Sequence, residues 1–265
     1  MRRQVRSNSK PQGWRINLVR FLKALAIIMS LLGVAILTNV FYNQYKFNQR
    51  NDRLVEQALK QKHNQQASKS NDNTINVFEA KYGVPKAVLE IPKIKLKIGL
   101  YKERASKVEN NEILANAAEV LQHTDWVDGG IGKHSSIAGH SGLFIDELFD
   151  QINQLKKKDR FYIHVNGEVH TYQVDQIKTV WPDNVNDLAR QSGKDYITLI
   201  TCTPKVRNDH RLLVRGRRID SQMPPKQVNQ LDDIELKLIV AALGLVALIL
   251  IVIIQKGRKK AYGQH

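Results

Sequence analysis

Cys202 is the one cysteine in this 265-residue chain. A lone thiol cannot be half of an intrachain disulfide, and most free cysteines are small buried apolar side chains. Cys202, however, directly follows the apolar stretch 196–201, which is typical of a central β-strand. A thiolate at the end of such a strand could act as a nucleophile.

Arg211 is the candidate partner of this thiol. After Cys202 the chain forms a short loop, 203–210, and enters a second strand-like stretch, 211–218. If the two strands pair as neighbours, Cys202 and Arg211 face each other across the mouth of the loop. A guanidinium there can stabilise a thiolate and donate hydrogen bonds to an oxyanion. The alternative is a solvated charge at a strand end, which is our interpretation of Arg215, Arg217 and Arg218.

A thiolate nucleophile also needs an acid that protonates the leaving amine, and histidine suits this task. His140 is the best candidate among eight histidines, because it follows the strand-like stretch 135–139 and precedes Ser141-Gly142, where a turn leaves its ring unobstructed. His210, beside Arg211, is the second candidate. Most histidines are polar surface residues, so position alone does not decide between them.

The elements that position these residues are mainly strands. Short stretches rich in β-branched and aromatic residues, broken by Pro and Gly, predict a single mainly-β domain, a barrel or a sandwich, with small helical insertions. The predicted strands are 88–94, 96–101, 135–138, 161–165, 168–180, 196–201 and 212–219, and the predicted helices are 108–118 and 148–155.

The charge of the chain is unevenly distributed. The formal net charge is +16. Residues 1–42 contain seven basic residues and residues 236–265 contain five, with no acidic residue in either segment, so these ends hold twelve of the sixteen charges. Proteins that bind nucleic acid concentrate Lys and Arg in the folded domain, which argues against a nucleic-acid partner.

Next to the basic residues at each end lies an uncharged apolar stretch, 24–40 and 238–254. Both stretches are typical of membrane helices with basic flanks. At about 1.5 Å per residue each approaches the length that crosses a hydrocarbon layer of about 30 Å. The alternatives are a signal peptide for the first and a buried core helix for the second. The positive-inside rule predicts both termini in the cytoplasm, an outer domain and contact with membrane lipid.

The predicted organisation has seven parts. They are a basic cytoplasmic N-terminus (1–23), a transmembrane helix (24–42), a membrane-proximal stalk that is partly helical at best (43–76), a catalytic domain (77–219), a tether (220–235), a second transmembrane helix (236–254) and a basic cytoplasmic tail (255–265).

Several motifs together resemble the sortase family, and in particular its pilus-assembling class C. They are TLITCTP at 198–204, Asn208, HRLLVRG at 210–216 and GHSG at 139–142. The likeness extends from about Leu89 to Ile219, and the interval of nine between Cys202 and Arg211 is the one that class C uses. A second membrane span after the domain is also a common feature of class C.

The resemblance implies a closed eight-stranded β-barrel between N- and C-terminal transmembrane helices, and a cysteine transpeptidase from a Gram-positive cell surface. Cys202 would attack the Thr carbonyl of an LPxTG-like sorting signal on a surface protein or pilin. His140 would be the general acid and base, and Arg211 would hold the substrate and the oxyanion. An amine, from a pilin lysine or a cell-wall precursor, would resolve the thioacyl enzyme. No cofactor and no metal are expected.

This sequence departs from the class C pattern in two places, so a role of the protein in pilus assembly stays open. Residues 71–78 lack the Asp-Pro pair of the usual lid, although Phe78 could still plug the cleft, and Lys205-Val206 stand where Tyr-Gly is common. Housekeeping wall anchoring is therefore an alternative, and an extracellular cysteine peptidase or a non-catalytic wall-binding scaffold are others.

Overall fold

The computed structural model describes residues 12–60, 77–141, 148–204, 207–220 and Gly244. The chain divides into two compact units, residues 1–43 with 233–265 and residues 44–232, which we describe separately. Except for Gly244, the predicted tether from residue 221 and the predicted second membrane helix (236–254) lie outside the described residues.

The first unit contains the apolar part of helix α1 (Gln12–Lys60). Within the described residues, α1 is the one helix that is long and apolar enough to cross a membrane. The apolar side chains of residues 24–39 are exposed, as a helix surrounded by lipid requires. The predicted first apolar helix is therefore present and is consistent with a membrane anchor.

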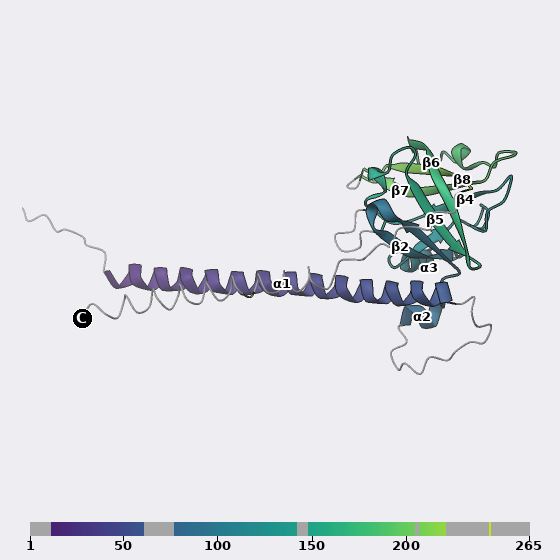
Figure 1. Ribbon diagram of the computed structural model, residues 1–265. Helices are drawn as coiled ribbons and strands as arrows, with labels where there is room; N and C mark the ends of the chain where they lie inside the picture. The colour runs from purple at the N-terminus through teal and green to yellow at the C-terminus, as the bar shows by residue number, and fades with distance from the viewer. Residues whose placement is uncertain (1–11, 61–76, 142–147, 205–206, 221–243, 245–265) are drawn as a thin grey trace, which may run out of the picture. The chain divides into compact units, whose positions relative to one another are not determined.

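The second unit is built on a closed β-barrel (Figure 1). Its strands are β1 (Ala87–Ile91), β2 (Leu96–Lys102), β3 (Ala118–Val120), β4 (His134–Ala138), β5 (Arg160–Val165), β6 (Glu168–Val180), β7 (Tyr196–Thr203) and β8 (His210–Ile219). They are ordered β1-β2-β3-β4-β7-β8-β6-β5 around the barrel. Two pairs, β2 with β3 and β4 with β7, are parallel, and the others are antiparallel.

Alternation along the strands separates the interior of the barrel from its outer face. Ile137 of β4, Leu199 of β7 and Val214 of β8 are fully buried in the core. The neighbouring residues along each strand therefore point to the outer face. This alternation is what the period-two pattern of the sequence predicts, and a closed barrel, rather than a sandwich, is the result.

The end of α1 packs on this unit and corrects one expectation. Residues 43–60 were expected to form a stalk that is partly helical at best, but they are helical throughout. Leu54 and Val55 are buried, and the Asn51 side-chain amide donates to the Lys97 carbonyl at 2.7 Å. Because tertiary packing stabilises an amphipathic helix far more than intrinsic propensity does, a weak pattern sufficed here.

A second apolar cluster lies outside the barrel. It joins α1 to α2 (Val77–Tyr82), α3 (Lys107–Leu114) and β2, and its members are Leu54, Phe78, Tyr82, Tyr101, Ile113 and Ala117. The Phe78 ring lies 4.8 Å from that of Tyr82 and 5.6 Å from that of Tyr101. The suggestion that Phe78 plugs the active-site cleft is therefore wrong, because its ring is buried in this cluster.

Three local predictions also need correction. Residues 92–94 form a 3₁₀ turn, η1 (Pro92–Ile94), instead of the end of a strand. The predicted helix 108–118 ends earlier, with α3 at Leu114. Strand β3 follows it and pairs with β2 on one side and β4 on the other. Within the predicted helix 148–155, the one helical element is η2 (Ile152–Gln154). For residues 118–120, pairing with β2 and β4 overrode local helix propensity.

Glu119 on β3 is a buried carboxyl on the outer face, in register with Tyr101 and Ala138. Its side chain is 2% exposed, and Oε1 has no hydrogen-bond partner in the described part of the chain. Burial, together with the like charge of Glu103, raises the pKa of Glu119 to about 8. The carboxyl therefore keeps its proton at neutral pH.

This raised pKa predicts a loss of stability with increasing pH. The unfolded chain releases this proton near pH 4.5, whereas the folded chain holds it to about pH 8. Between these values the native state binds more protons, so the free energy of unfolding falls as pH rises and levels off above pH 8. Glu119→Gln should remove this dependence and stabilise the protein at pH 8 by about 1–3 kcal/mol.

Thermal unfolding of the full chain in detergent at pH 5 and pH 8 measures this effect. The exposed Glu168→Gln serves as a matched control, with its side chain 70% exposed. The interpretation fails if Glu119→Gln and the control show the same pH dependence as the unaltered chain.

Candidate functional site

The register of three neighbouring strands brings the predicted site residues into one row. β4 and β7 pair in parallel from His134↔Tyr196 to Ala138↔Ile200, and continuing this register sets His140 beside Cys202. β7 and β8 pair antiparallel, with Cys202↔Arg211. The three residues therefore lie side by side across β4, β7 and β8 at one rim of the barrel.

Hydrogen bonds continue the β4–β7 pairing beyond the end of β4. The Gly139 amide donates to the Ile200 carbonyl at 3.1 Å, and Thr201 Oγ1 donates to the Gly139 carbonyl at 2.9 Å. Ser141 Oγ then donates to the carbonyl of Cys202 itself at 2.7 Å. The backbone on both sides of His140 is thus fixed to β7, the strand that contains Cys202.

Gly139 has a steric reason to be glycine. A Cβ at this position would lie 2.5 Å from the Phe149 ring, a fully buried core side chain. The Phe149 amide also donates to the His140 carbonyl at 3.1 Å. Phe149 therefore packs directly against the backbone that presents His140, which a larger residue at 139 would displace.

His140 is half-buried, and this burial lowers the pKa of its imidazole below the usual value. A lowered pKa favours the neutral ring at neutral pH, because desolvation disfavours the charged form. Such a ring can accept a proton from an attacking nucleophile and, once charged, return it to a leaving group. Cys202, at the end of β7, is likewise partly exposed, so a substrate can reach both groups.

Arg211 is held by the loop that joins β7 to β8. Its Nη1 donates to the carbonyls of Asn208 at 3.1 Å and His210 at 3.0 Å. Asn208 has φ of +53°, and its amide donates to the Pro204 carbonyl at 2.8 Å. Both hydrogen bonds that the Arg211 side chain makes with the described residues come from Nη1, so Nε and Nη2 can serve a ligand.

The second histidine candidate, His210, lies in the adjoining row. It pairs with Thr203, so alternation directs its side chain to the opposite face of the sheet from Cys202 and Arg211. Its Nδ1 is 2.9 Å from Asp209 Oδ1, and its ring packs at a tilt against that of Trp181. The geometry therefore favours His140 as the histidine beside the thiol.

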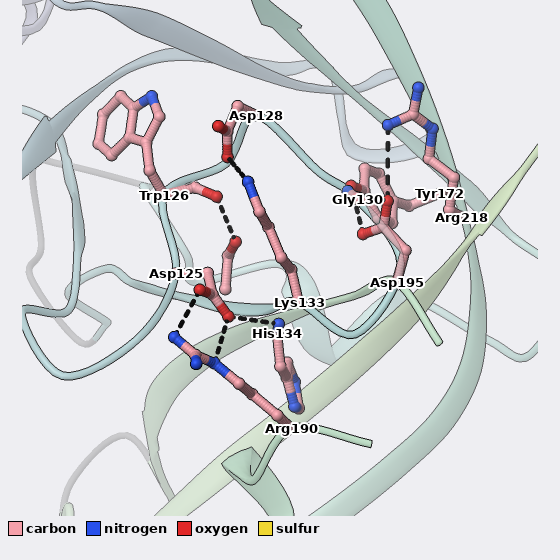
Figure 2. A network of polar contacts seen from close by, with 11 residues as sticks. Asp125, Trp126, Asp128, Gly130, Lys133, His134, Tyr172, Arg190, Asp195 and Arg218 are labelled. Atoms are coloured by element: carbon pink, nitrogen blue, oxygen red, sulfur yellow. Dashed lines mark hydrogen bonds and ion pairs between the residues drawn. The ribbon is translucent and has the colours of Figure 1, made fainter. Parts of the chain in front are cut away.

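A polar network anchors the connection between β6 and β7 to β4 (Figure 2). Arg190 Nε and Nη2 donate to both oxygens of Asp125 at 2.8 and 2.7 Å, and Asp125 accepts the His134 amide at 2.9 Å. The ring of His134 lies within hydrogen-bond distance of the Ala189 carbonyl and Thr198 Oγ1. The pKa of His134 is lowered mainly by burial. This burial is consistent with a structural role for the His134 side chain.

The same connection is also tied to β6. Asp187 accepts hydrogen bonds from Gln176 and Lys178 on the outer face of that strand. Sequence reasoning did not find these contacts, because the partners are many residues apart and carry no motif. Asn208 and Gly139 both lie within recognisable motifs, but the contact of Asn208 with Arg211 and the packing of Phe149 on Gly139 do not follow from the sequence.

No cluster of three or more His, Cys, Asp or Glu side chains suited to a metal ion occurs among the described residues. The row instead contains a thiol, an imidazole and a guanidinium. This combination suits covalent acyl transfer, in which the thiol attacks a carbonyl, the imidazole moves protons and the guanidinium stabilises the oxyanion.

Comparisons with known proteins agree with this class. The family model described as "Sortase domain" matches residues 89–219. Sortase A from Bacillus anthracis is 29% identical over 210 residues, which cover 76% of this chain and 96% of that protein. The chain belongs to the sortase family, whose members are cysteine transpeptidases.

Solved structures are similar over the same region. The crystal structure of sortase C1 from Streptococcus suis matches with a TM-score of 0.50 and 32% identity, covering 65% of this chain and 98% of that one. Sortase C1 of GBS pilus island 1 matches with a TM-score of 0.50 and 31% identity, covering 67% and 87% of the two chains. The expected eight-stranded barrel with short helices is confirmed.

The positive φ of Asn208 yields a prediction about Arg211. Asn208→Gly keeps this backbone conformation, whereas Asn208→Val opposes it by about 1–3 kcal/mol of strain and should turn the 208 carbonyl away from Arg211. We expect kcat/KM for a sorting-signal peptide to stay within about twofold in the glycine variant and to fall about tenfold in the valine variant. Peptide cleavage assays measure this difference, with thermal unfolding to show that both variants fold. Equal activities would contradict it.

Proposed function

We propose that this sortase uses Cys202 as nucleophile, His140 as general acid and base, and Arg211 to position the substrate and stabilise the oxyanion. The single row of these residues across β4, β7 and β8 is the observation that supports this assignment. The substrate is a protein with an LPxTG-like sorting signal, cleaved between Thr and Gly, and no cofactor takes part.

The first half of the reaction forms a thioester. His140 takes the proton of the Cys202 thiol, and the resulting thiolate attacks the Thr carbonyl carbon while Arg211 donates hydrogen bonds to the oxyanion. The C–N bond then breaks as His140 gives its proton to the leaving amine. The C-terminal fragment departs, and the N-terminal part of the substrate stays on Cys202 Sγ.

The second half returns the enzyme to its starting state. The neutral amine of an acceptor attacks the thioester carbonyl, and His140 takes a proton from the nitrogen. The C–S bond breaks, an amide bond forms, and the released Cys202 thiolate takes the proton back from His140. Because the thioester preserves the energy of the cleaved amide, no other energy source is needed.

For the acceptor we favour a pilin lysine, which makes this a class C enzyme. The similar sortase C1 structures support this choice. One of them is that of sortase C1 of GBS pilus island 1. Wall anchoring is the second candidate, because curated relatives from Bacillus anthracis and Staphylococcus aureus are named sortase A. A competition between a lysine peptide and a cell-wall precursor amine for the same thioacyl enzyme discriminates the two.

The proposed roles predict distinct losses. Cys202→Ala and His140→Ala should each abolish turnover, because neither the thioester nor the proton transfer can then occur. Arg211→Lys should reduce kcat/KM about 100-fold, because a point charge cannot replace a planar fork of donors. The assay incubates an LPxTG peptide with an amine and quantifies the transpeptidation product. Full activity in either alanine variant, or hydrolysis alone at high amine concentration, would refute the assignment.

We further propose two membrane spans, 24–42 and 236–254, with both termini in the cytoplasm and the catalytic domain outside. The basic residues that flank both apolar stretches support this topology. A membrane-impermeant maleimide should therefore label Cys202 in intact cells. In a Cys202→Ala background, Ala261→Cys in the C-terminal tail should be labelled only after permeabilisation. Labelling of the tail in intact cells would overturn the two-span topology.

A further inference from the structure

An exposed aromatic side chain stands at the same rim as the catalytic row. Trp181, the first residue after β6, is 62% exposed. Its ring lies 4.2 Å from that of His210, with 31° between the ring planes. His210 Nδ1 in turn meets Asp209, which also accepts two hydrogen bonds from Arg207. A large exposed ring that is already fixed in orientation loses little entropy when it binds a partner.

The strand register relates this pair to the reacting groups. Val180 pairs with Arg211, which pairs with Cys202. Since neighbouring strands are about 4.8 Å apart, Val180 lies about 10 Å from Cys202 across the sheet. Trp181 follows Val180, and alternation directs it, like His210, to the face opposite that of Cys202. The two rings therefore border the rim over which Cys202 is reached.

The outer face is not available to a second substrate. A thioacyl peptide on Cys202 would occupy this face, since Cys202 and Arg211 both point there. The connection between β6 and β7 also crosses it, bonded to β6 through Asp187 and to β4 through Ala189. An acceptor that attacks the thioester must therefore approach over the rim, past Trp181 and His210.

We propose that Trp181 and His210 form the acceptor subsite of this enzyme, and that the acceptor it fits is a primary amine at the end of a long alkyl stem, the chemistry of a lysine side chain. The apolar stem of lysine packs well on aromatic surface while its amine extends beyond. A short α-amine would leave the rings uncovered at this distance from Cys202. This inference rests on the proposed function, because it needs a thioacyl enzyme on Cys202.

The subsite can be tested by how the thioacyl enzyme divides between two amines. The full chain in detergent is acylated with an LPxTG peptide, then offered a lysine-containing peptide and hydroxylamine, which is too small to contact the rings. Trp181→Ala should lower the ratio of lysine product to hydroxylamine product about tenfold. Trp181→Phe should restore most of the ratio, because it keeps an aromatic surface.

Val185→Ala is the matched control, since Val185 is an apolar residue of the same connection and is 64% exposed. It should leave the ratio as it is in the unaltered chain. An unchanged ratio in Trp181→Ala, or an equal fall for both amines, overturns the subsite while leaving the proposed function intact. Failure of the unaltered chain to form any acyl enzyme overturns the proposed function, and the subsite with it.

Discussion

The register between β4, β7 and β8 is the constraint on which the rest of the site depends. Hydrogen bonding at a constant offset sets His140 beside Cys202 and Cys202 opposite Arg211, although 71 positions separate the first from the last in the sequence. Because side chains alternate with period two, a slip of one residue in either pairing would send one group to the wrong face. The fully buried core residues Ile137, Leu199 and Val214 resist such a slip, since it would expose them. The apolar core of the barrel thus maintains the geometry of polar groups at its rim.

Strand register alone places backbones, and local contacts then orient the side chains. Phe149 packs against Gly139 and leaves no space for a larger residue there. This contact fixes the segment that leads to His140. The left-handed conformation of Asn208 turns a carbonyl toward Arg211. These two contacts fix His140 and Arg211 through their own neighbours, in addition to the strand register that the three groups share. Such preorganisation is effective because no rearrangement is then needed as charge develops during the reaction.

Much of this could be predicted from the sequence, because the relevant signals are local. The strands that contain Cys202 and Arg211, β7 and β8, are consecutive in the chain, so their pairing followed from the short loop between them. His140 was harder, since the parallel pairing of β4 with β7 leaves no signal in the spacing. β3 was missed because three residues carry too little pattern to distinguish a strand from a helix end. The docking of α1 beyond residue 43 depends on partners in β2 and α3, which the helix sequence does not reveal.

The competition between water and an amine for the thioester connects the site to its surroundings. In the proposed mechanism both nucleophiles lose a proton to His140, whose lowered pKa favours the neutral ring, so proton transfer does not discriminate between them. Water is also far more abundant than any acceptor. Transfer can prevail only if the acceptor is held near the carbonyl, where its effective concentration exceeds its concentration in solution. In the proposed topology, a membrane anchor contributes to this by confining the enzyme to the surface where its proposed substrates are tethered. In the proposed subsite the aromatic rings at the rim act at closer range, since they give the stem of an amine a surface that water cannot use.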